Sequence, residues 1–254
     1  MTIAGRFLAL FVLGALTAAA DAPKAPVRNV VLVHGAWADG SSWAKVIPIL
    51  EKAGLHVVAV QNPPTSLADD VATVQRAIAL EDGPVILVGH SYGGAVITEA
   101  GADPKVAGLV YVAAFAPDAG QGVLDLGKDL PPAPGGADIR PDKGGFLKMT
   151  SKGIEEDFAQ DLPKADRRIL AATQGPTNGA AFGAKVSNAA WKSKPTWYVV
   201  ASNDRMIQPD LERQFAKTMG AKTITVASSH VPMLSHPQDV ARLIIDAAKG
   251  VPVD

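Results

Sequence analysis

The stretch Val85-Ile86-Leu87-Val88-Gly89-His90-Ser91-Tyr92-Gly93-Gly94 decides the fold. Its first four residues predict a buried strand, and the Gly-x-Ser-x-Gly pattern leads from that strand into a helical segment. In such a turn the serine is held in a strained conformation, and the small residues Gly89 and Gly93 let strand and helix approach closely. The pattern alone also fits an ordinary glycine-rich turn, but the flanking strand and helix favour Ser91 as a nucleophile.

Outward from this strand, short apolar runs rich in β-branched residues recur along the chain. They predict strands at 30–33, 55–60, 85–88, 109–112, 196–201 and 222–226. Near-continuous apolar runs of this kind are typical of parallel strands that are covered on both faces.

Helical patterns separate these runs. Ser66 begins a capping box, and apolar residues then recur at helical spacing. The segments 209–219 and 237–249 each begin with Pro and are followed by Gly, which is typical of helices. Alternating strands and helices predict an α/β fold, a doubly wound and mainly parallel sheet.

The regular alternation lapses between about residues 117 and 194, where Pro and Gly cluster ahead of a helical stretch at about 154–173. We interpret this segment as a cap inserted into a single domain of residues 21–254, with a disordered linker as the alternative. Its apolar residues should pack, and those from 146 to 170 should face an acyl group. They are Phe146, Leu147, Phe158, Leu162, Ile169 and Leu170.

The first twenty residues differ from the rest. Arg6 precedes the apolar run 7–13, and the segment ends on Ala18-Ala19-Ala20. This predicts a secretory signal peptide at residues 1–20, a mature chain that begins near Asp21, and a periplasmic or secreted protein. A membrane anchor is the alternative, but the run is shorter than the roughly 20 apolar residues that a span needs.

Composition excludes several classes of function. The 254-residue chain has a net charge of −1 and no basic run, which argues against a nucleic-acid partner. It has no cysteine, which excludes disulfides, thiolate catalysis and cysteine-bound zinc. The sequence does not indicate an oligomeric state.

A serine nucleophile needs a base and a group that orients the base, and in this fold the chain order is Ser, Asp or Glu, then His. His230 follows the last predicted strand and is the expected base, whereas His236 precedes Pro237 and is expected to cap the final helix. Asp204, just past the strand 196–201, is the expected acid, with Asp118 as its rival.

An acyl-transfer site also needs backbone N–H groups that hold the developing oxyanion. We expect one from Tyr92 and the other from Ala36, in the loop after the first strand. His34 is expected to brace that loop by hydrogen bonding. Several apolar residues are candidates for the pocket or for the core: Trp37, Phe115, Phe146, Met149, Trp191 and Met233.

Four pieces of the chain together resemble the α/β-hydrolase superfamily, in particular small bacterial esterase-like members related to plant methyl-esterases and hydroxynitrile lyases. They are Val-His-Gly-Ala-Trp (33–37), Gly-His-Ser-Tyr-Gly-Gly (89–94), Asn-Asp-Arg-Met-Ile-Gln-Pro (203–209) and Ser-His (229–230) followed by Pro-Gln-Asp-Val (237–240). The resemblance implies a six-stranded parallel core, a small cap and catalysis without a cofactor or metal.

The residues therefore predict a serine hydrolase of a small carboxylic ester, with an acyl-enzyme intermediate. Lyase or perhydrolase chemistry on the same fold is an alternative, and a ligand-binding protein is another. The hydroxynitrile lyases of the family have Thr in place of Gly35 and Lys in place of Val231, which argues against the lyase. Dehalogenases carry Asp at the nucleophile position, so Ser91 excludes that branch.

Overall fold

The computed structural model describes residues 27–251 of the chain. The predicted signal peptide and its cleavage site lie outside the described residues. Among the helices of the part that is described, none is both long and apolar enough to cross a bilayer.

A six-stranded sheet with the order β2-β1-β3-β4-β8-β9 forms the centre of the molecule, and all its pairings are parallel. This confirms the predicted α/β fold with a doubly wound parallel sheet. The strands are β1 (Asn29–Val33), β2 (His56–Val60), β3 (Val85–Ser91), β4 (Val106–Ala114), β8 (Thr196–Ala201) and β9 (Lys222–Val226). Every residue of β1, β3 and β8 is buried, as the continuous apolar runs predict.

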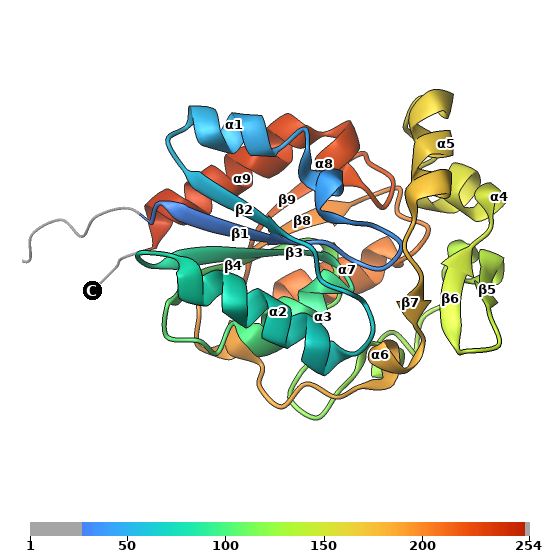
Figure 1. Cartoon of the computed structure of the whole chain (residues 1–254), viewed down its shortest axis with the longest axis horizontal. Helices are drawn as coiled ribbons and strands as arrows, with labels where there is room; N and C mark the ends of the chain where they lie inside the picture. Colours follow the sequence, from blue (N-terminus) through green and yellow to red (C-terminus); the bar gives the residue numbers. More distant parts are fainter. Residues whose placement is uncertain (1–26, 252–254) are drawn as a thin grey trace, which may run out of the picture.

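Helices cover both faces of this sheet (Figure 1). On one face lie α1 (Ile47–Lys52) and α9 (Pro237–Gly250); on the other lie α2 (Leu67–Leu80), α3 (Gly93–Ala100) and α7 (Pro209–Thr218). The side chain of Ser66 accepts a hydrogen bond from the Asp69 N–H at 3.1 Å, as the capping box predicts for the start of α2. Pro209 and Pro237 begin their helices, where a missing N–H costs nothing.

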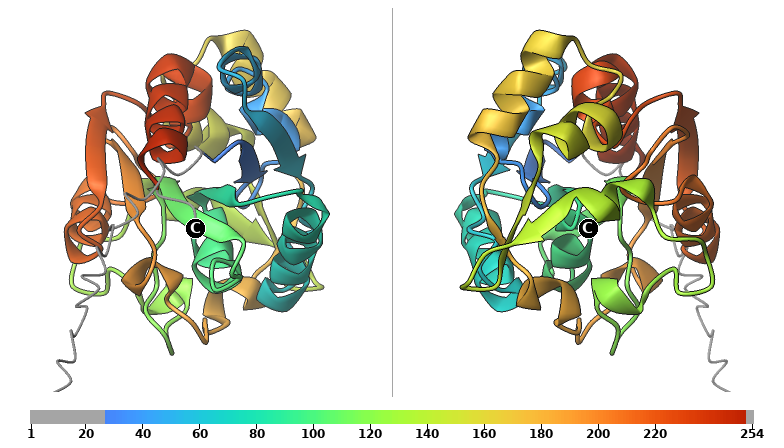
Figure 2. Two further views of the ribbon diagram at one scale, coloured as in Figure 1. Left: turned by 90° about the vertical axis from the view of Figure 1, so that its left-hand side faces the viewer. Right: turned by 90° about the vertical axis from the view of Figure 1, so that its right-hand side faces the viewer.

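The inserted segment, residues 115–195, joins β4 to β8. It lies beyond the carboxyl ends of the parallel strands for most of its length and then returns past α3 to the start of β8 (Figures 1 and 2). It contains a three-stranded antiparallel sheet that the sequence did not predict: β5 (Ile139–Pro141), β6 (Phe146–Met149) and β7 (Thr177–Asn178). Its short helices are α4 (Ser151–Gly153), the π-helix η4 (Ile154–Phe158), α5 (Lys164–Thr173) and α6 (Ala180–Gly183), and its 3-10 turns are η2 (Val123–Asp125), η3 (Pro134–Asp138) and η5 (Ala190–Lys192).

The helical stretch expected at about 154–173 is therefore interrupted, with Pro163 directly before α5. Phe158 and Leu162 are buried, as predicted. Ile169 is 60% exposed, so the prediction that its side chain packs was wrong. It lies on α5, which has no buried residue. This helix is a surface element.

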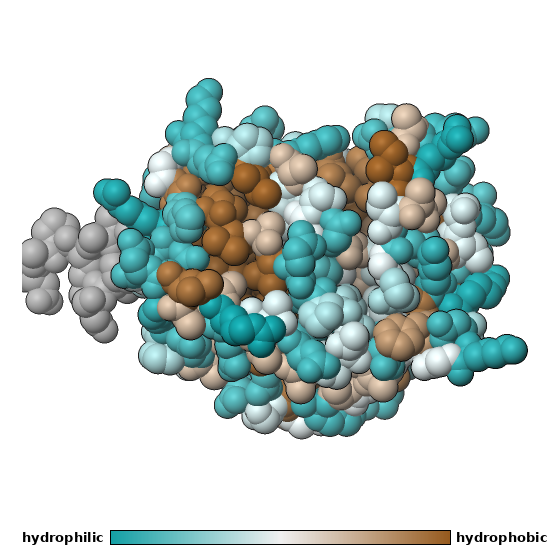
Figure 3. Space-filling model, viewed as in Figure 1, coloured by the Kyte–Doolittle hydropathy of each residue, from teal (hydrophilic) through white to brown (hydrophobic). Residues whose placement is uncertain are grey.

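The sheet ends at β2 on one side, since β2 pairs only with β1 among the described strands. Figure 3 shows apolar side chains gathered over this edge, between α1 and α2. Val57, Val58 and Ala59 of β2 are only partly buried there.

The first turn after β1 is a 3-10 helix, η1 (Gly40–Trp43), capped by the carboxylate of Asp39, which accepts from the Ser41 N–H at 2.7 Å. The last helix is preceded by the short α8 (Pro232–Ser235). η1 contacts β1 and β2, and α8 contacts η1 and β4, so the loops after β1 and β9 lie side by side.

Candidate active site

Ser91 is the last residue of β3, and α3 begins two residues later. Its φ of +53° lies in the left-handed region, which a residue with a Cβ adopts only under strain. A Cβ at Gly89 would lie 2.6 Å from the Gly93 carbonyl oxygen, and one at Gly93 would lie 2.8 Å from the His34 carbonyl oxygen. The two glycines therefore permit the close approach that the sequence pattern predicted.

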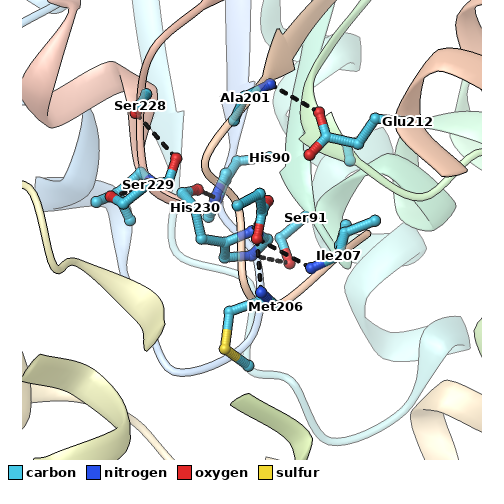
Figure 4. Close-up of polar contacts among 12 residues, drawn as sticks. His90, Ser91, Ala201, Met206, Ile207, Glu212, Ser228, Ser229 and His230 are labelled. Carbon is cyan, nitrogen blue, oxygen red and sulfur yellow. Dashed lines mark hydrogen bonds and ion pairs between the residues drawn. The ribbon is translucent and has the colours of Figure 1, made fainter. Parts of the chain in front are cut away.

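Three side chains from different strand ends meet at this turn (Figure 4). His230 Nε2 lies 2.8 Å from Ser91 Oγ, and His230 Nδ1 lies 2.5 Å from Asp204 Oδ2. The other oxygen of Asp204, Oδ1, accepts hydrogen bonds from the N–H groups of Met206 at 2.6 Å and Ile207 at 2.9 Å. The imidazole is thus oriented with one nitrogen on the hydroxyl and the other on a fixed carboxylate.

The two rivals named from the sequence lie elsewhere. The Asp118 carboxylate pairs with Lys192 at 2.5 Å, and this ion pair holds the pKa of Asp118 below its ordinary value. His236 stands at the N-cap position of α9, but its side chain makes no capping hydrogen bond, and its Nδ1 lies 3.0 Å from Ser235 Oγ. The expected capping by His236 was therefore wrong, although its position at the helix start was right.

His90, which the sequence analysis left without a role, holds the backbone of the loop that carries His230. Its Nε2–H donates to the His230 carbonyl oxygen at 2.7 Å. Burial keeps the pKa of His90 well below its ordinary value, so the ring is neutral. The Phe158 ring lies edge-on to His230 at 5.2 Å between centroids and to His90 at 6.5 Å.

The inserted segment also braces the loops of the acid and the base through polar contacts. The Gln160 side chain donates to the carbonyl oxygen of Asn203 at 2.7 Å, next to Asp204. The Asp161 carboxylate accepts from the N–H of Ser229 at 2.9 Å, next to His230. Asp157 forms an ion pair with Arg205 at 2.5 Å. No role was predicted for these three polar residues, which restrain the loops that carry Asp204 and His230. Phe158 and Leu162, apolar residues of the same stretch that were expected to face an acyl group, are buried in the core instead.

The loop after β1 lies against the nucleophile turn. The N–H groups of Ala36 and Tyr92 have no acceptor among residues 27–251, so both remain able to donate. Trp37 follows Ala36 with a φ of +58°, and its indole N–H donates to the carbonyl oxygen of Leu147 at 3.0 Å. His34 Nδ1 donates to the carbonyl oxygen of Gly35 at 2.8 Å, which braces the same loop.

A cavity of about 340 Å³ opens in front of Ser91 and His230. Besides Ser91 and His230, the cavity is lined by one polar side chain, that of Gln208, and by no Asp, Glu, Lys or Arg. The walls come from the loop after β1, from 123–139, from β6 and α6 and from the start of α7: Trp37, Phe115, Val123, Leu124, Leu126, Gly127, Leu130, Pro131, Pro132, Ala133, Gly136, Ile139, Leu147, Phe182, Met206, Ile207 and Leu211.

Trp37 and Phe115, both pocket candidates from the sequence, line the cavity. Four other candidates do not: Phe146, Met149, Trp191 and Met233. Met149 and Met233 are fully enclosed in the core, while Trp191 donates its indole N–H to the Pro117 carbonyl oxygen at 2.9 Å. In β6 alternate residues face opposite sides, so Leu147 faces the cavity and its neighbour Phe146 does not.

Two buried acids that the sequence did not single out lie behind the site. Asp70 accepts a hydrogen bond from the Tyr92 hydroxyl at 2.8 Å, and burial raises the pKa of Asp70 to about 6, against the effect of that bond. Burial raises the pKa of Glu212 well above its ordinary value, and the nearby Asp204 raises it further. In the described part of the chain, no three acidic or histidine side chains gather in a way that would hold a metal ion.

Comparison with known proteins gives one family. A family model described as "Alpha/beta hydrolase family" matches residues 30–243 of the chain. The chain is 29% identical over 241 residues to an alpha-hydroxynitrile lyase of Arabidopsis thaliana, a match that covers 83% of this chain and 93% of the lyase.

Two further similarities are to hydrolases. A carbendazim hydrolyzing esterase of Nocardioides sp. (strain SG-4G) is 39% identical over 122 residues, which cover 42% of this chain and half (50%) of that esterase. The crystal structure of a pyrethroid hydrolase from Sphingobium faniae JZ-2 superposes with a TM-score of 0.76 at 26% identity, covering 87% of this chain and 97% of the other.

Proposed function

The chain belongs to the alpha/beta hydrolase family, and from this premise we propose that it is a serine carboxylesterase for small, uncharged, apolar esters. The observation that carries the proposal is the Ser91–His230–Asp204 chain of contacts, at 2.8 and 2.5 Å, at the floor of an apolar cavity. A receptor would need the cavity but would not need this arrangement.

In the proposed mechanism, Ser91 Oγ attacks the ester carbonyl carbon while His230 Nε2 takes the hydroxyl proton. Asp204 keeps the imidazole in the required tautomer and stabilises the positive charge that forms on it. The N–H groups of Ala36 and Tyr92 hold the oxyanion. His230 then returns the proton to the departing alcohol, and water hydrolyses the acyl-enzyme with His230 again acting as base.

The lining of the cavity supports the choice of substrate. An ester that carried a carboxylate or an ammonium into it would lose its hydration and meet no side chain of opposite charge, which costs several kcal/mol. A volume of about 340 Å³ falls within the range of small-molecule sites. The acyl and alcohol groups are therefore both expected to be apolar.

The alternative of lyase chemistry is less well supported. A Cβ at position 35 would lie 2.7 Å from the Ser91 Cβ and 2.8 Å from the His90 carbonyl oxygen, so this backbone has no room for the Thr of the lyases. Val231 is buried and supplies no cation beside His230. We further propose that the protein is exported, on the strength of its first twenty residues alone.

The test combines covalent labelling with a panel of esters. Fluorophosphonate should label wild-type protein once, at Ser91, and p-nitrophenyl butyrate should be hydrolysed at least about a hundredfold faster than the matching ester with a terminal carboxylate. The Ser91→Ala variant should remain folded and lose roughly 10⁴-fold or more in kcat. Retention of a tenth of the activity by this variant, or binding of esters without labelling, would refute the proposal.

A further inference from the structure

Glu212 is a buried carboxyl group for which the proposed mechanism has no use. It lies in the first turn of α7 with no exposed surface. Its Oε2 accepts a hydrogen bond from the N–H of Ala201, the last residue of β8, at 2.9 Å (Figure 4). Its other oxygen, Oε1, is buried and has no conventional donor among the described residues.

The second carboxyl here is that of Asp204, whose own N–H donates to the carbonyl oxygen of Ala201 at 3.2 Å, so both acids are held on the same residue at the end of β8. The charge of Asp204 acts on Glu212. Two carboxylates held together in a dry interior cannot both be ionised at low cost, so one of them keeps a proton. Asp204 already accepts three N–H groups, from Met206, Ile207 and His230. Because both oxygens of Asp204 already accept N–H groups while Oε1 of Glu212 accepts none, the proton belongs on Glu212.

The other ionisable groups around Glu212 agree with this assignment. The Tyr198 hydroxyl donates to the carbonyl oxygen of Ala114, so it is not directed at the carboxyl. Arg213 is the cation that acts on Glu212, but its side chain is about half (49%) exposed and paired with Asp210. Burial, followed by the charge of Asp204, raises the pKa of Glu212 well above its ordinary value.

We propose that Glu212 stays protonated during catalysis and donates a hydrogen bond to Asp204, and so acts as a positioning residue for the Asp204–His230 pair. The inference rests on the proposed function, because it assigns Glu212 a role through the triad. The donated bond holds Asp204 in place and disperses part of its negative charge. Without this bond, the carboxylate would stabilise a protonated His230 more strongly.

Two substitutions separate this role from the alternatives. Glu212→Gln keeps an acceptor for the Ala201 N–H and a donor for Asp204, so the pH profile of kcat/KM should match that of wild type. Glu212→Met fills a similar volume without either group. In that variant the acid limb of the profile should move to higher pH by about half a unit to one unit. The fall in kcat should be larger than any change in KM.

The matched control is Asp210→Asn, which removes one charge from the exposed side of the same helix. It should leave the profile unchanged. A shift of the acid limb to lower pH in Glu212→Gln would show that Glu212 is ionised, and an unmoved limb in a folded Glu212→Met variant would show that it is not coupled to the triad. Either result would overturn the proposal.

Two readouts do not depend on ester hydrolysis. The infrared spectrum of wild-type protein at pH 8 should contain the carbonyl stretch of a protonated carboxyl group, and this band should be absent from Glu212→Gln. In an NMR titration, the midpoint for the His230 ring should move in each variant as the acid limb of its kinetic profile does. Absence of the infrared band overturns the proposal even if Glu212→Met fails to fold. If these readouts appear as expected in a protein that hydrolyses no ester, the proposed function fails and the Glu212–Asp204 contact stands.

Discussion

Asp70 provides a test of the energetics behind the nucleophile turn. Its carboxylate is completely buried, and the Tyr92 hydroxyl donates to its Oδ2 at 2.8 Å. Burial raises the pKa of Asp70 from 3.8 to about 6. Since the folded protein binds this proton more tightly than the unfolded chain, the ionised carboxylate destabilises the fold above pH 6, and the cost disappears as the pH falls toward 4.

The size of the effect follows from the two pKa values. A difference of about two units at 1.36 kcal/mol per unit corresponds to at most about 3 kcal/mol in the free energy of unfolding. Asp70→Asn removes the charge and keeps an acceptor for the Tyr92 hydroxyl. Its new N–H group has a partner at hand in the side-chain amide of the buried Asn62, which acts on Asp70 and whose oxygen accepts no other hydrogen bond in the described part of the chain.

We therefore expect Asp70→Asn to be more stable than wild type at pH 8, by up to about 3 kcal/mol, and by less than about 1 kcal/mol at pH 4. Urea denaturation at the two pH values measures this difference. A variant that is less stable at pH 8, or equally stabilised at both values, would show that the carboxylate is not strained by burial. Activity at pH 8 should change little, since the role proposed for Tyr92 uses only its backbone N–H.

The neighbouring residue supplies a control with the opposite sign. Asp69 is exposed, and hydrogen bonds from the hydroxyls of Ser66 and Thr65 hold its pKa below its ordinary value. A carboxylate of this kind stabilises the fold above its unfolded pKa, and the contribution is lost as the pH falls. Asp69→Asn should therefore be less stable than wild type at pH 8 and approach it at low pH.

Three further outcomes are expected. His230→Ala should lose as much activity as Ser91→Ala, roughly 10⁴-fold or more in kcat. His236→Ala should keep its activity, and kinetics with one ester as substrate measures the difference. Leu147→Ala should change the ranking among short esters by about 1–3 kcal/mol in transition-state binding, while Phe146→Ala, one residue away and outside the cavity, should leave the ranking unchanged. Intact-mass measurement of exported protein should give a chain that begins near Asp21, and a mass that includes residues 1–20 would contradict the predicted cleavage.

The sequence predicted those features that depend on residue type repeated at a regular spacing. The bounds of β8 and β9 agree with the predicted strands residue for residue, because both are short apolar or β-branched runs between clear breaks. Ser91, Asp204 and His230 were chosen because each follows a predicted strand, and parallel strands end at the same edge of a sheet. The structure brings these three side chains together at that edge.

The contacts that hold the site could not be predicted in this way. The carbonyl oxygens of Leu147 and Asn203 and the N–H of Ser229 are backbone groups that every residue type would supply. Glu212 has the sequence position of an ordinary acidic residue in a first helical turn, where a negative charge is favourable. Only the fold shows that it is fully buried, bonded to the backbone of Ala201 and under the influence of the charge of Asp204.

The inserted segment explains why Ser91, Asp204 and His230 could be predicted from the sequence while most residues that line the cavity could not. Residues 123–139 line the cavity from irregular turns, where no periodicity marks one side of the chain as internal. Residues 157–161 contact the loops of Asp204 and His230 instead of the cavity. One part of the insertion thus lines the cavity, and another restrains the loops that carry Asp204 and His230. A substitution in the first part should alter which ester reacts, whereas one in the second should slow all esters alike, because it disturbs only the groups that every substrate shares.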